Sequence, residues 1–232
     1  KVENETFQIP LGNKNQHRIT LKYEGTLSGL PQKTEGLSSV SLMVSETGSY
    51  LSSWSAWHPY AKGVASSYNL KIITPEDHRA IVPGRLVEEQ KIDGFYTAVF
   101  ESEIPAIGIV LIAGRFVVNE RRHKKVLFRT YFSSELSDLS EKYLETTIKY
   151  IDHFEKLIGD YPFSSFSIIS GPLPVGLGFP GMTYLGERVL RLPFILFTSL
   201  GHEVLHSWWG NGVKIDFKKG NWAEGLTTYM AD

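Results

Sequence analysis

Cysteine is absent from the 232-residue chain. Disulfides and thiolate metal ligands are therefore excluded, and any metal ion must be held by histidine and carboxylate side chains. An excess of one charge is also absent, because 24 Lys and Arg nearly balance 25 Asp and Glu and leave a formal net charge of -1. Such a chain has no long-range field that attracts phosphate backbones, so nucleic acid is not expected among its partners.

Long apolar runs are missing as well. The longest candidate, Ile107 to Val118, is interrupted by Gly108, Gly114 and Arg115 and falls short of the roughly 20 residues that span a bilayer. We therefore expect no membrane-spanning segment and a soluble chain. The sequence begins at Lys1 rather than Met, so a signal peptide or membrane anchor could precede it. A cytoplasmic and a cell-envelope location are both compatible with the sequence.

The chain does contain the material for a packed core. Its hydrophobic fraction is 42%, and 13 Phe, 11 Tyr and 5 Trp supply large side chains, as in ordinary soluble globular proteins. The length lies at the upper edge of one domain, and a change of pattern near Ser133 favours two.

From the start of the chain to about Phe132 the hydrophobic pattern has period two. Over His17 to Leu27, apolar Ile19, Leu21 and Tyr23 alternate with polar residues, which is typical of a strand with one buried face. Gly, Pro, Asn or Asp separate most of the similar stretches that follow. These stretches run over Tyr68 to Ile73, Gly94 to Glu101, Gly108 to Val118 and Val126 to Phe132. Together they predict an all-β domain over residues 1–133.

After Ser133 the period changes. An apolar stripe from Leu139 to Ile158 predicts a helix that ends at Gly159. Next, Phe163 to Ser170 is typical of a strand, and Gly171 to Gly181, rich in Gly and Pro, predicts a shaped loop. A second helix is predicted from about Phe194 to Trp208, and a third from near Trp222. Residues 134–232 are therefore predicted to form a second domain that mixes helices with strand, giving an α+β fold class.

The second predicted helix contains the sequence His202-Glu203-Val204-Leu205-His206. A four-residue separation puts the two imidazoles on one face of a helix, one turn apart, so both can reach the same ion. Glu203 lies beside the first histidine and can point toward a water on the open side of the metal. Zinc suits such a site, because a catalytic zinc takes three nitrogen or oxygen ligands and leaves its fourth position to water.

A third ligand must follow the two histidines, and Asp216, Glu224 and Asp232 are the candidates downstream. Glu224 is favoured because it lies in the apolar segment Asn221 to Leu226, where metal coordination would remove the cost of burying a carboxylate. Asp216 lies among lysines and is more easily solvated. The alternative to a metal site is that the pentapeptide from His202 to His206 arose by chance on an amphipathic helix, with two ordinary half-buried histidines. The matching register of the three residues favours a single zinc ion per chain.

The run from His202 to Asn211, followed by Trp222-Ala223-Glu224-Gly225, resembles the zinc signature of the M1 aminopeptidases, a group of gluzincins. The resemblance implies a β-rich N-terminal domain followed by the first part of a thermolysin-like α/β catalytic domain. Trp57-His58-Pro59-Tyr60 is similar to a segment of that β domain. The spacing from His206 to Glu224 is one residue shorter than the family usually has, which a connecting loop absorbs.

A second departure concerns substrate binding. Gly181-Met182-Thr183 falls where the family carries a Gly-x-Met-Glu-Asn motif, whose glutamate holds the free amine of the substrate. By this resemblance Gly181, Met182 and Thr183 are the candidate substrate-binding residues. Thr183 offers a neutral hydroxyl in place of the carboxylate, which puts strict aminopeptidase specificity in doubt. Glu187 is a possible replacement, although pairing with Arg188 at the surface is the simpler interpretation.

These residues predict a zinc metallopeptidase acting on peptides, with Glu203 as catalytic base and His202, His206 and Glu224 as ligands. Two alternatives remain open: an M1-like peptide-binding module without activity, and a zinc hydrolase with a non-peptide substrate. M1 enzymes also use a tyrosine well beyond the ligand glutamate. The sequence ends at Asp232, inside a predicted helix, so we expect a fragment of a longer protein with weak or no activity by itself.

Overall fold

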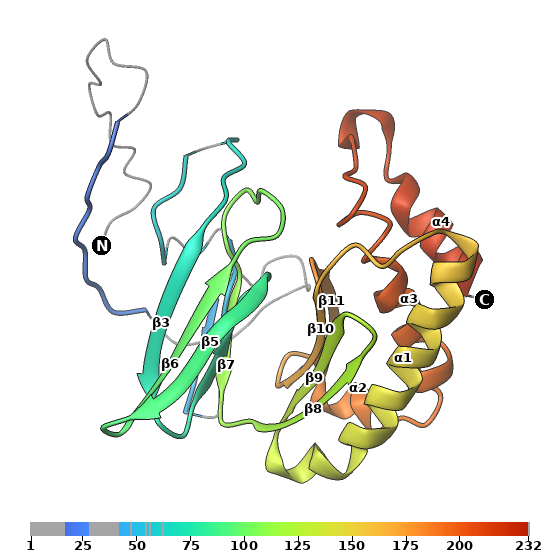
Figure 1. Ribbon diagram of the computed structural model, residues 1–232, viewed down its shortest axis with the longest axis horizontal. Helices are drawn as coiled ribbons and strands as arrows, with labels where there is room; N and C mark the ends of the chain where they lie inside the picture. The colour runs from blue at the N-terminus through green and yellow to red at the C-terminus, as the bar shows by residue number, and fades with distance from the viewer. Residues whose placement is uncertain are drawn as a thin grey trace.

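The structure, a computed structural model, describes residues 17–27, 42–46, 48–53, 55, 57–61 and 63–231. Within these residues, two small β-sheets are followed by a larger one, and helices cover the outer face of the larger sheet (Figure 1). The α+β fold class predicted from the sequence is confirmed.

The first two sheets are antiparallel. A four-stranded sheet has the order β1 (Leu42–Val44), β2 (Gly48–Leu51), β7 (Leu111–Gly114) and β4 (Arg79–Ile81). A three-stranded sheet has the order β3 (Asn69–Pro75), β6 (Phe95–Glu101) and β5 (Arg85–Ile92). One face of β6 is buried and the other is more exposed, which explains the alternating pattern of its sequence.

Strand β5 is not among the predicted strands, because its outward positions carry several charged residues that hide the period-two pattern. A two-residue turn connects it to β6. Asp93 and Gly94 both have positive φ, at 52° and 78°, as a hairpin turn of type I′ requires. The Asp-Gly pair is therefore the local signal that fixes this hairpin.

The five-stranded sheet has the order β11 (Gly176–Phe179), β12 (Met182–Gly186), β10 (Ser165–Gly171), β9 (Val126–Phe132) and β8 (Val117–His123). Its three central strands are parallel, and the outer strands β8 and β11 are antiparallel to their neighbours. Both faces are covered, so β10 is buried along nearly its whole length.

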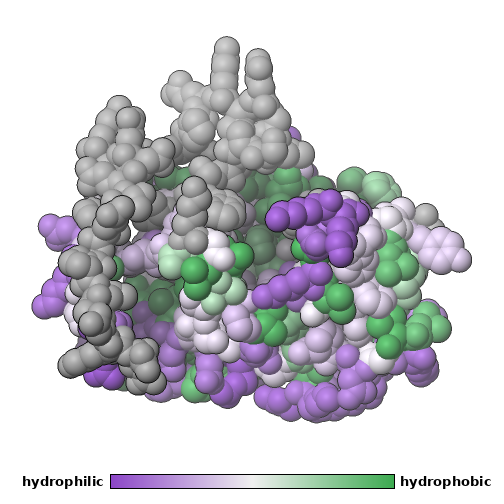
Figure 2. Space-filling model, turned by 90° about the horizontal axis from the view of Figure 1, so that it is seen from above, coloured by the Kyte–Doolittle hydropathy of each residue, from purple (hydrophilic) through white to green (hydrophobic). Residues whose placement is uncertain are grey.

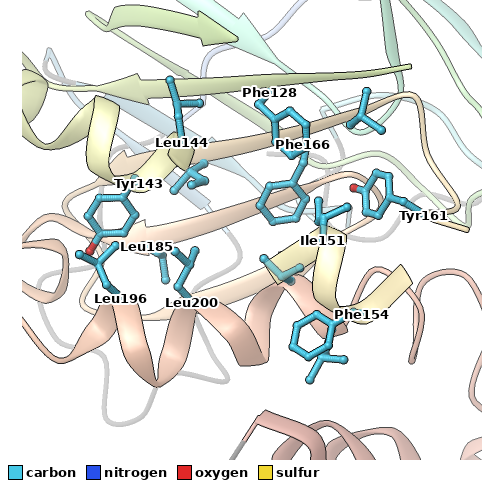
Figure 3. Close-up of a cluster of buried hydrophobic side chains, with 14 of the residues drawn as sticks. Phe128, Tyr143, Leu144, Ile151, Phe154, Tyr161, Phe166, Leu185, Leu196 and Leu200 are labelled. Atoms are coloured by element: carbon cyan, nitrogen blue, oxygen red, sulfur yellow. The ribbon is translucent and has the colours of Figure 1, made fainter. Parts of the chain in front are cut away.

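Helices cover one face of this sheet. They are η2 (Ser134–Leu139), α1 (Ser140–Leu157), α2 (Glu187–Leu190), η3 (Ile195–Phe197), α3 (Ser199–Leu205) and α4 (Trp222–Ala231), and a further turn of 3-10 helix, η4, spans Phe217–Lys219. Figure 3 shows strand residues Phe128 and Phe166 near Ile151 of α1, and Leu200 of α3 beside Leu185 of β12, all within one buried cluster. This cluster fixes α3, and with it the segment from His202 to Leu205, against the sheet.

The opposite face packs against the four-stranded sheet. Met43, Tyr50 and Ile112 of that sheet share a buried cluster with Ile169 and Tyr184 of the five-stranded sheet. The five-stranded sheet is therefore the central layer of the molecule, between β-structure on one side and helices on the other (Figure 1).

A polar network joins the three-stranded sheet to the five-stranded one. The guanidinium of Arg129 on β9 lies 2.8 Å from a carboxylate oxygen of Glu89 and 2.7 Å from one of Glu120. Its Nη1 also donates to the hydroxyl of Tyr131 at 3.2 Å, and the Tyr96 hydroxyl donates to Glu89 at 2.8 Å. Arg129 is 9% exposed, so this is a largely buried cation with two carboxylate partners.

Sheet membership bears on the predicted domain limits. Strands β8 and β9, which the sequence pattern assigned to residues 1–133, pair with β10 in the sheet that carries the helices. The predicted stretch Gly108 to Val118 divides into β7 and the start of β8, which belong to different sheets. The division at residues 133/134 stays a prediction, and these pairings favour placing it before Val117.

The predicted strand over His17 to Leu27 does not form within the described structure. These residues are exposed and have no strand assignment, with Ile19 48% and Tyr23 62% exposed. A period-two pattern specifies which side chains share a face, but a strand also needs a neighbour that pairs with its backbone. None of the described strands takes that place here.

The Trp57-His58 pair is anchored to the main chain of Ile109. The indole Nε1 of Trp57 donates to the Ile109 carbonyl at 2.9 Å, and the Ile109 N–H donates to His58 Nε2 at 2.9 Å. These bonds give the segment a structural role.

No described helix combines the length and the apolar character that crossing a membrane requires. On the face seen in Figure 2, hydrophilic and hydrophobic side chains are interspersed among the residues drawn in colour.

Candidate metal and catalytic site

Helix α3 is shorter than the predicted helix from Phe194 to Trp208. Thr198 leaves helical geometry, with φ -124° and ψ -85°, and separates η3 from α3. Its hydroxyl donates to the carbonyl of Phe194 at 3.0 Å, a local bond that competes with the regular helical pattern. His206 follows the last residue of α3 but keeps helical dihedrals, and its N–H donates to the His202 carbonyl at 3.3 Å. The one-turn relation between the two histidines is therefore preserved.

The three predicted ligand side chains lie together. His202 Nε2 and His206 Nε2 are 3.1 Å apart. Each lies 3.3 Å from a carboxylate oxygen of Glu224. Across the described residues, this trio is a group whose ligand atoms all lie within 4.8 Å of one another.

These separations match the needs of zinc. Two ligand atoms bound at about 2.0–2.1 Å to a tetrahedral zinc lie about 3.3 Å from each other. Two imidazole nitrogens and a carboxylate that face one another at this spacing also present several lone pairs to one point, which a divalent cation stabilises. The donor set of two nitrogens and one oxygen suits zinc in particular and leaves a fourth position open.

A second hydrogen bond orients His206. Its Nδ1 lies 3.1 Å from the carbonyl oxygen of Trp209. When Nδ1–H donates to this carbonyl, Nε2 keeps its lone pair and faces the other two ligands, as metal-binding histidines usually require. Gly210 then ends the segment with a φ of 103°, a left-handed conformation that suits glycine.

Helix α4 brings Glu224 to the histidines. Ala223 and Thr227 are fully buried. The rings of Trp209 and Trp222 lie 6.1 Å apart, and Trp209 Nε1 lies 3.3 Å from the sulfur of Met230. These contacts hold α4 beside α3 and leave the Glu224 side chain 54% exposed at the open side of the cluster.

The other two candidates for the third ligand are Asp216 and Asp232. Asp216 accepts a hydrogen bond from the N–H of Lys218 at 3.2 Å, in the connection between α3 and α4, and does not join the trio. Asp232 lies outside the described residues.

The predicted base, Glu203, is a neighbour of the ligands on α3. Burial raises the pKa of its carboxyl group, and the nearby Glu224 carboxylate acts in the same direction. His206 and a hydrogen bond from Thr183 lower that pKa and partly offset the effect. Glu203 is thus a largely desolvated carboxyl group beside the three convergent ligand atoms.

Strand β11 passes directly against this carboxyl group. A Cβ atom added to Gly176 would lie 2.8 Å from Glu203 Oε1. One added to Gly178 would lie 3.2 Å from Glu203 Oε2 and 3.3 Å from His206 Cβ. The two glycines therefore allow the strand backbone to approach the base and one ligand closely.

The candidate substrate-binding residues Gly181, Met182 and Thr183 lie at and just before the start of β12, and their role in substrate binding stays a prediction. Met182 and Thr183 belong to β12, which pairs with β10 on one side and β11 on the other, and both are buried. Gly181 precedes them with a φ of 68°. Because its main chain is paired on both sides, β12 cannot offer a free edge to a substrate. Thr183 does reach the site, with Oγ1 3.4 Å from Glu203 Oε2.

Glu187 begins α2 and lines a cavity of about 300 Å³ between the four-stranded and five-stranded sheets, together with Arg115 and Tyr184. Neither histidine of the trio lines this cavity.

Sequence reasoning missed β11. The Gly- and Pro-rich stretch from Gly171 to Gly181 predicted a loop, yet Gly176–Phe179 forms the outer strand next to the site. A signal for this strand was present in the sequence. Small and large residues alternate with period two over Gly176, Leu177, Gly178 and Phe179, which is typical of a strand.

No family model matches the chain. Among curated proteins, it is 29% identical over 153 residues to mouse (Mus musculus) aminopeptidase RNPEPL1, a match that covers 62% of this chain and 20% of that protein. Against the human (Homo sapiens) protein of the same name, the identity is 24% over 176 residues, with 72% and 23% covered. The chain thus spans about a fifth of the length of these curated relatives.

Among solved structures, the chain is similar to a mutant of a two-domain M1 zinc metallopeptidase bound to L-arginine. The TM-score is 0.61 at 15% identity, and the match covers 79% of this chain and 45% of that chain. At this identity the likeness shows the fold. Together with the curated matches, it confirms the resemblance indicated by the zinc signature: the chain is similar to an N-terminal part of the M1 aminopeptidases.

Proposed function

We propose that this chain carries the zinc centre of a metallopeptidase, with one ion held by Nε2 of His202, Nε2 of His206 and a carboxylate oxygen of Glu224. The observation that carries the proposal is the convergence of these atoms at 3.1 to 3.3 Å beside the buried carboxyl group of Glu203. The similarity to M1 aminopeptidases supports peptides as the substrate class.

A zinc ion at this position would lower the pKa of a water molecule to about 7 and polarise the scissile carbonyl. In the proposed mechanism Glu203 takes a proton from the attacking water and passes it to the leaving amine. A pKa raised by burial favours this role, because a base works best when its pKa lies near the operating pH.

The substrate is proposed to lie along β11. This strand is the outer member of the five-stranded sheet, and within the described residues no strand pairs with its other edge. An extended peptide can add to such an edge through main-chain hydrogen bonds. Since Gly176 and Gly178 hold the strand against Glu203 and His206, a peptide paired there would pass close to the ligand cluster.

Residues Gly176–Phe179 bring two glycines, a leucine and a phenylalanine to this edge and no carboxylate. A free substrate amine therefore finds no ion-pair partner on β11. We propose that the enzyme does not require a free N-terminal amine, so peptides with a blocked N-terminus should be cleaved at rates comparable to free ones.

Glu203→Gln tests the catalytic role. The amide keeps the shape of the side chain but cannot accept the water proton, so zinc should remain bound while peptide turnover falls by roughly a thousand-fold or more. Turnover would be measured at native protein length with free and N-acetylated fluorogenic peptides, and bound zinc by elemental analysis. Parental turnover in Glu203→Gln would remove the assigned base, whereas zinc binding without cleavage of any peptide would indicate a binding module or another substrate class.

A further inference from the structure

The hydroxyl group of Thr183 is buried in the five-stranded sheet, next to the proposed base. Thr183 is 0% exposed and belongs to β12. Its Oγ1 lies 3.3 Å from the carbonyl oxygen of Leu177 and 3.4 Å from Oε2 of Glu203. The hydroxyl has one proton and two acceptors in reach, and an ionised carboxylate is the stronger acceptor of the two.

The two glycines of β11 complete the surroundings of the carboxyl group. Gly176 and Gly178 lie two residues apart on the strand, so both face the same side, and added Cβ atoms would meet Oε1 and Oε2 of Glu203 respectively. Gly176, Gly178 and Thr183 therefore all lie close to the Glu203 carboxyl group. Of these three residues, Thr183 has a side chain that donates a hydrogen bond to it.

Desolvation makes this donor important. A carboxylate that leaves water loses hydrogen bonds, and a buried acceptor left without a donor is costly. The distance of 3.4 Å is long for an O–H···O bond, but hydrogen bonds in catalytic sites are often long before substrate binds and shorten in the reacting complex.

We propose that Thr183 is a positioning residue that fixes the orientation of the Glu203 carboxylate through its hydroxyl group. The expected effect of Thr183 on turnover rests on the proposed function, whereas the contact between Thr183 and Glu203 is independent of it. This assignment differs from a role in holding the substrate amine, because Thr183 is buried in β12 beside β11 and its hydroxyl contacts the proposed base.

Two substitutions at Thr183 test the contribution of its hydroxyl group separately from that of its side-chain shape. Thr183→Val keeps the volume and removes the donor, whereas Thr183→Ser keeps the donor. We expect kcat to fall about ten-fold in Thr183→Val with KM and zinc affinity unchanged, the fall that loss of one hydrogen bond to a charged group predicts. Thr183→Ser should restore most of the rate.

Thr130→Val is the matched control. Thr130 is fully buried in β9 of the same sheet, and its Oγ1 has no hydrogen-bond partner. The same chemical change should leave kcat unaltered there. A kcat reduced equally in Thr183→Val and Thr130→Val, or a Thr183→Ser variant as slow as Thr183→Val, would overturn the positioning role.

A measurement on zinc-free protein tests the contact without turnover. The carboxyl 13C resonance of Glu203, assigned with Glu203→Gln in 13C-glutamate-labelled protein, should shift in Thr183→Val and keep its parental position in Thr183→Ser and Thr130→Val. An unchanged resonance in Thr183→Val would overturn the proposal even if all variants hydrolyse peptides. A shifted resonance in a protein that neither binds zinc nor cleaves peptides would support the contact and reject the proposed function.

Discussion

The two faces of the five-stranded sheet are covered by different kinds of structure. On one face, α1 and α3 bury an apolar cluster, and the candidate metal ligands come from α3, from the residue that follows it and from α4. On the other, two antiparallel sheets pack through Tyr184 and through the ion network of Arg129. In the proposed function the chemistry lies on the helical face, and we expect the β-face to contribute stability. Substitutions on the two faces should therefore separate metal binding from folding.

His206→Ala should have the largest effect and act on metal binding alone. It removes a nitrogen ligand and the bond to the Trp209 carbonyl, so zinc affinity should fall by more than about a hundred-fold. The free energy of unfolding of the zinc-free protein should change little. Zinc affinity is measured by competition with a chromogenic chelator, and parental affinity in this variant would remove His206 from the ligand set.

Arg129→Met tests the β-face. The substitution keeps the apolar stem but leaves the carboxylates of Glu89 and Glu120 without their shared cation. We expect the free energy of unfolding to fall by about 2 kcal/mol, with zinc affinity unchanged. Urea denaturation measures the first quantity and chelator competition the second.

The control is Arg122→Met in the neighbouring strand β8. Arg122 is exposed and forms no ion pair with another described residue, so its loss should leave stability nearly unaltered. If Arg129→Met weakened zinc binding as strongly as His206→Ala, the proposed separation of the two faces would be incorrect.

Gly178→Ala tests the β11 edge, where the sheet meets the helical face. Its Cβ would crowd Glu203 Oε2 at 3.2 Å and His206 Cβ at 3.3 Å. We expect kcat to fall about ten-fold through displacement of the base, with a smaller loss of zinc affinity. Gly225→Ala, where an added Cβ has no neighbour within 4 Å, is the control and should keep the parental kcat. A Gly178→Ala variant with parental kinetics would mean that the close approach is not needed.

Lys124→Ala should have the smallest effect. The turn between β8 and β9 places the Lys124 ammonium 2.6 Å from Asp152 and 2.8 Å from Glu155 on α1, so part of the basic run 121–125 is paired with the helix. Hydrogen bonds from Lys124 lower the pKa of both carboxyl groups. Carboxyl groups with lowered pKa values stabilise the fold above their unfolded pKa values of about 4, and this contribution disappears as pH falls through the lowered values.

The Tm of Lys124→Ala should therefore lie slightly below the parental Tm at pH 7, and the difference should vanish in acid. Thermal unfolding monitored by circular dichroism between pH 7 and pH 2 measures it. A difference that grew toward low pH would contradict the sign of this linkage. Because the Lys124 side chain is 54% exposed, the shift should be small at any pH.

The helical side of the site was predictable from the sequence, and the strand side was not. The register of His202, Glu203 and His206 follows from helix geometry, and the apolar context of Trp222–Gly225 singled out Glu224. Those are local signals. The position of Thr183 depends on which strands pair with β12, a long-range property that glycine-rich sequence does not encode strongly. For the same reason the pattern found β9 but not the sheet to which it belongs.

The parallel pairing of β9 and β10 has a consequence for the order of folding. Parallel neighbours cannot be joined by a tight turn, and here the whole of α1 lies between them in the chain. We therefore expect the centre of the molecule to assemble through distant contacts and more slowly than the β5–β6 hairpin. Until α1 docks, the apolar strand β9 presents an unprotected surface during synthesis, which is the stage at which aggregation would compete with folding.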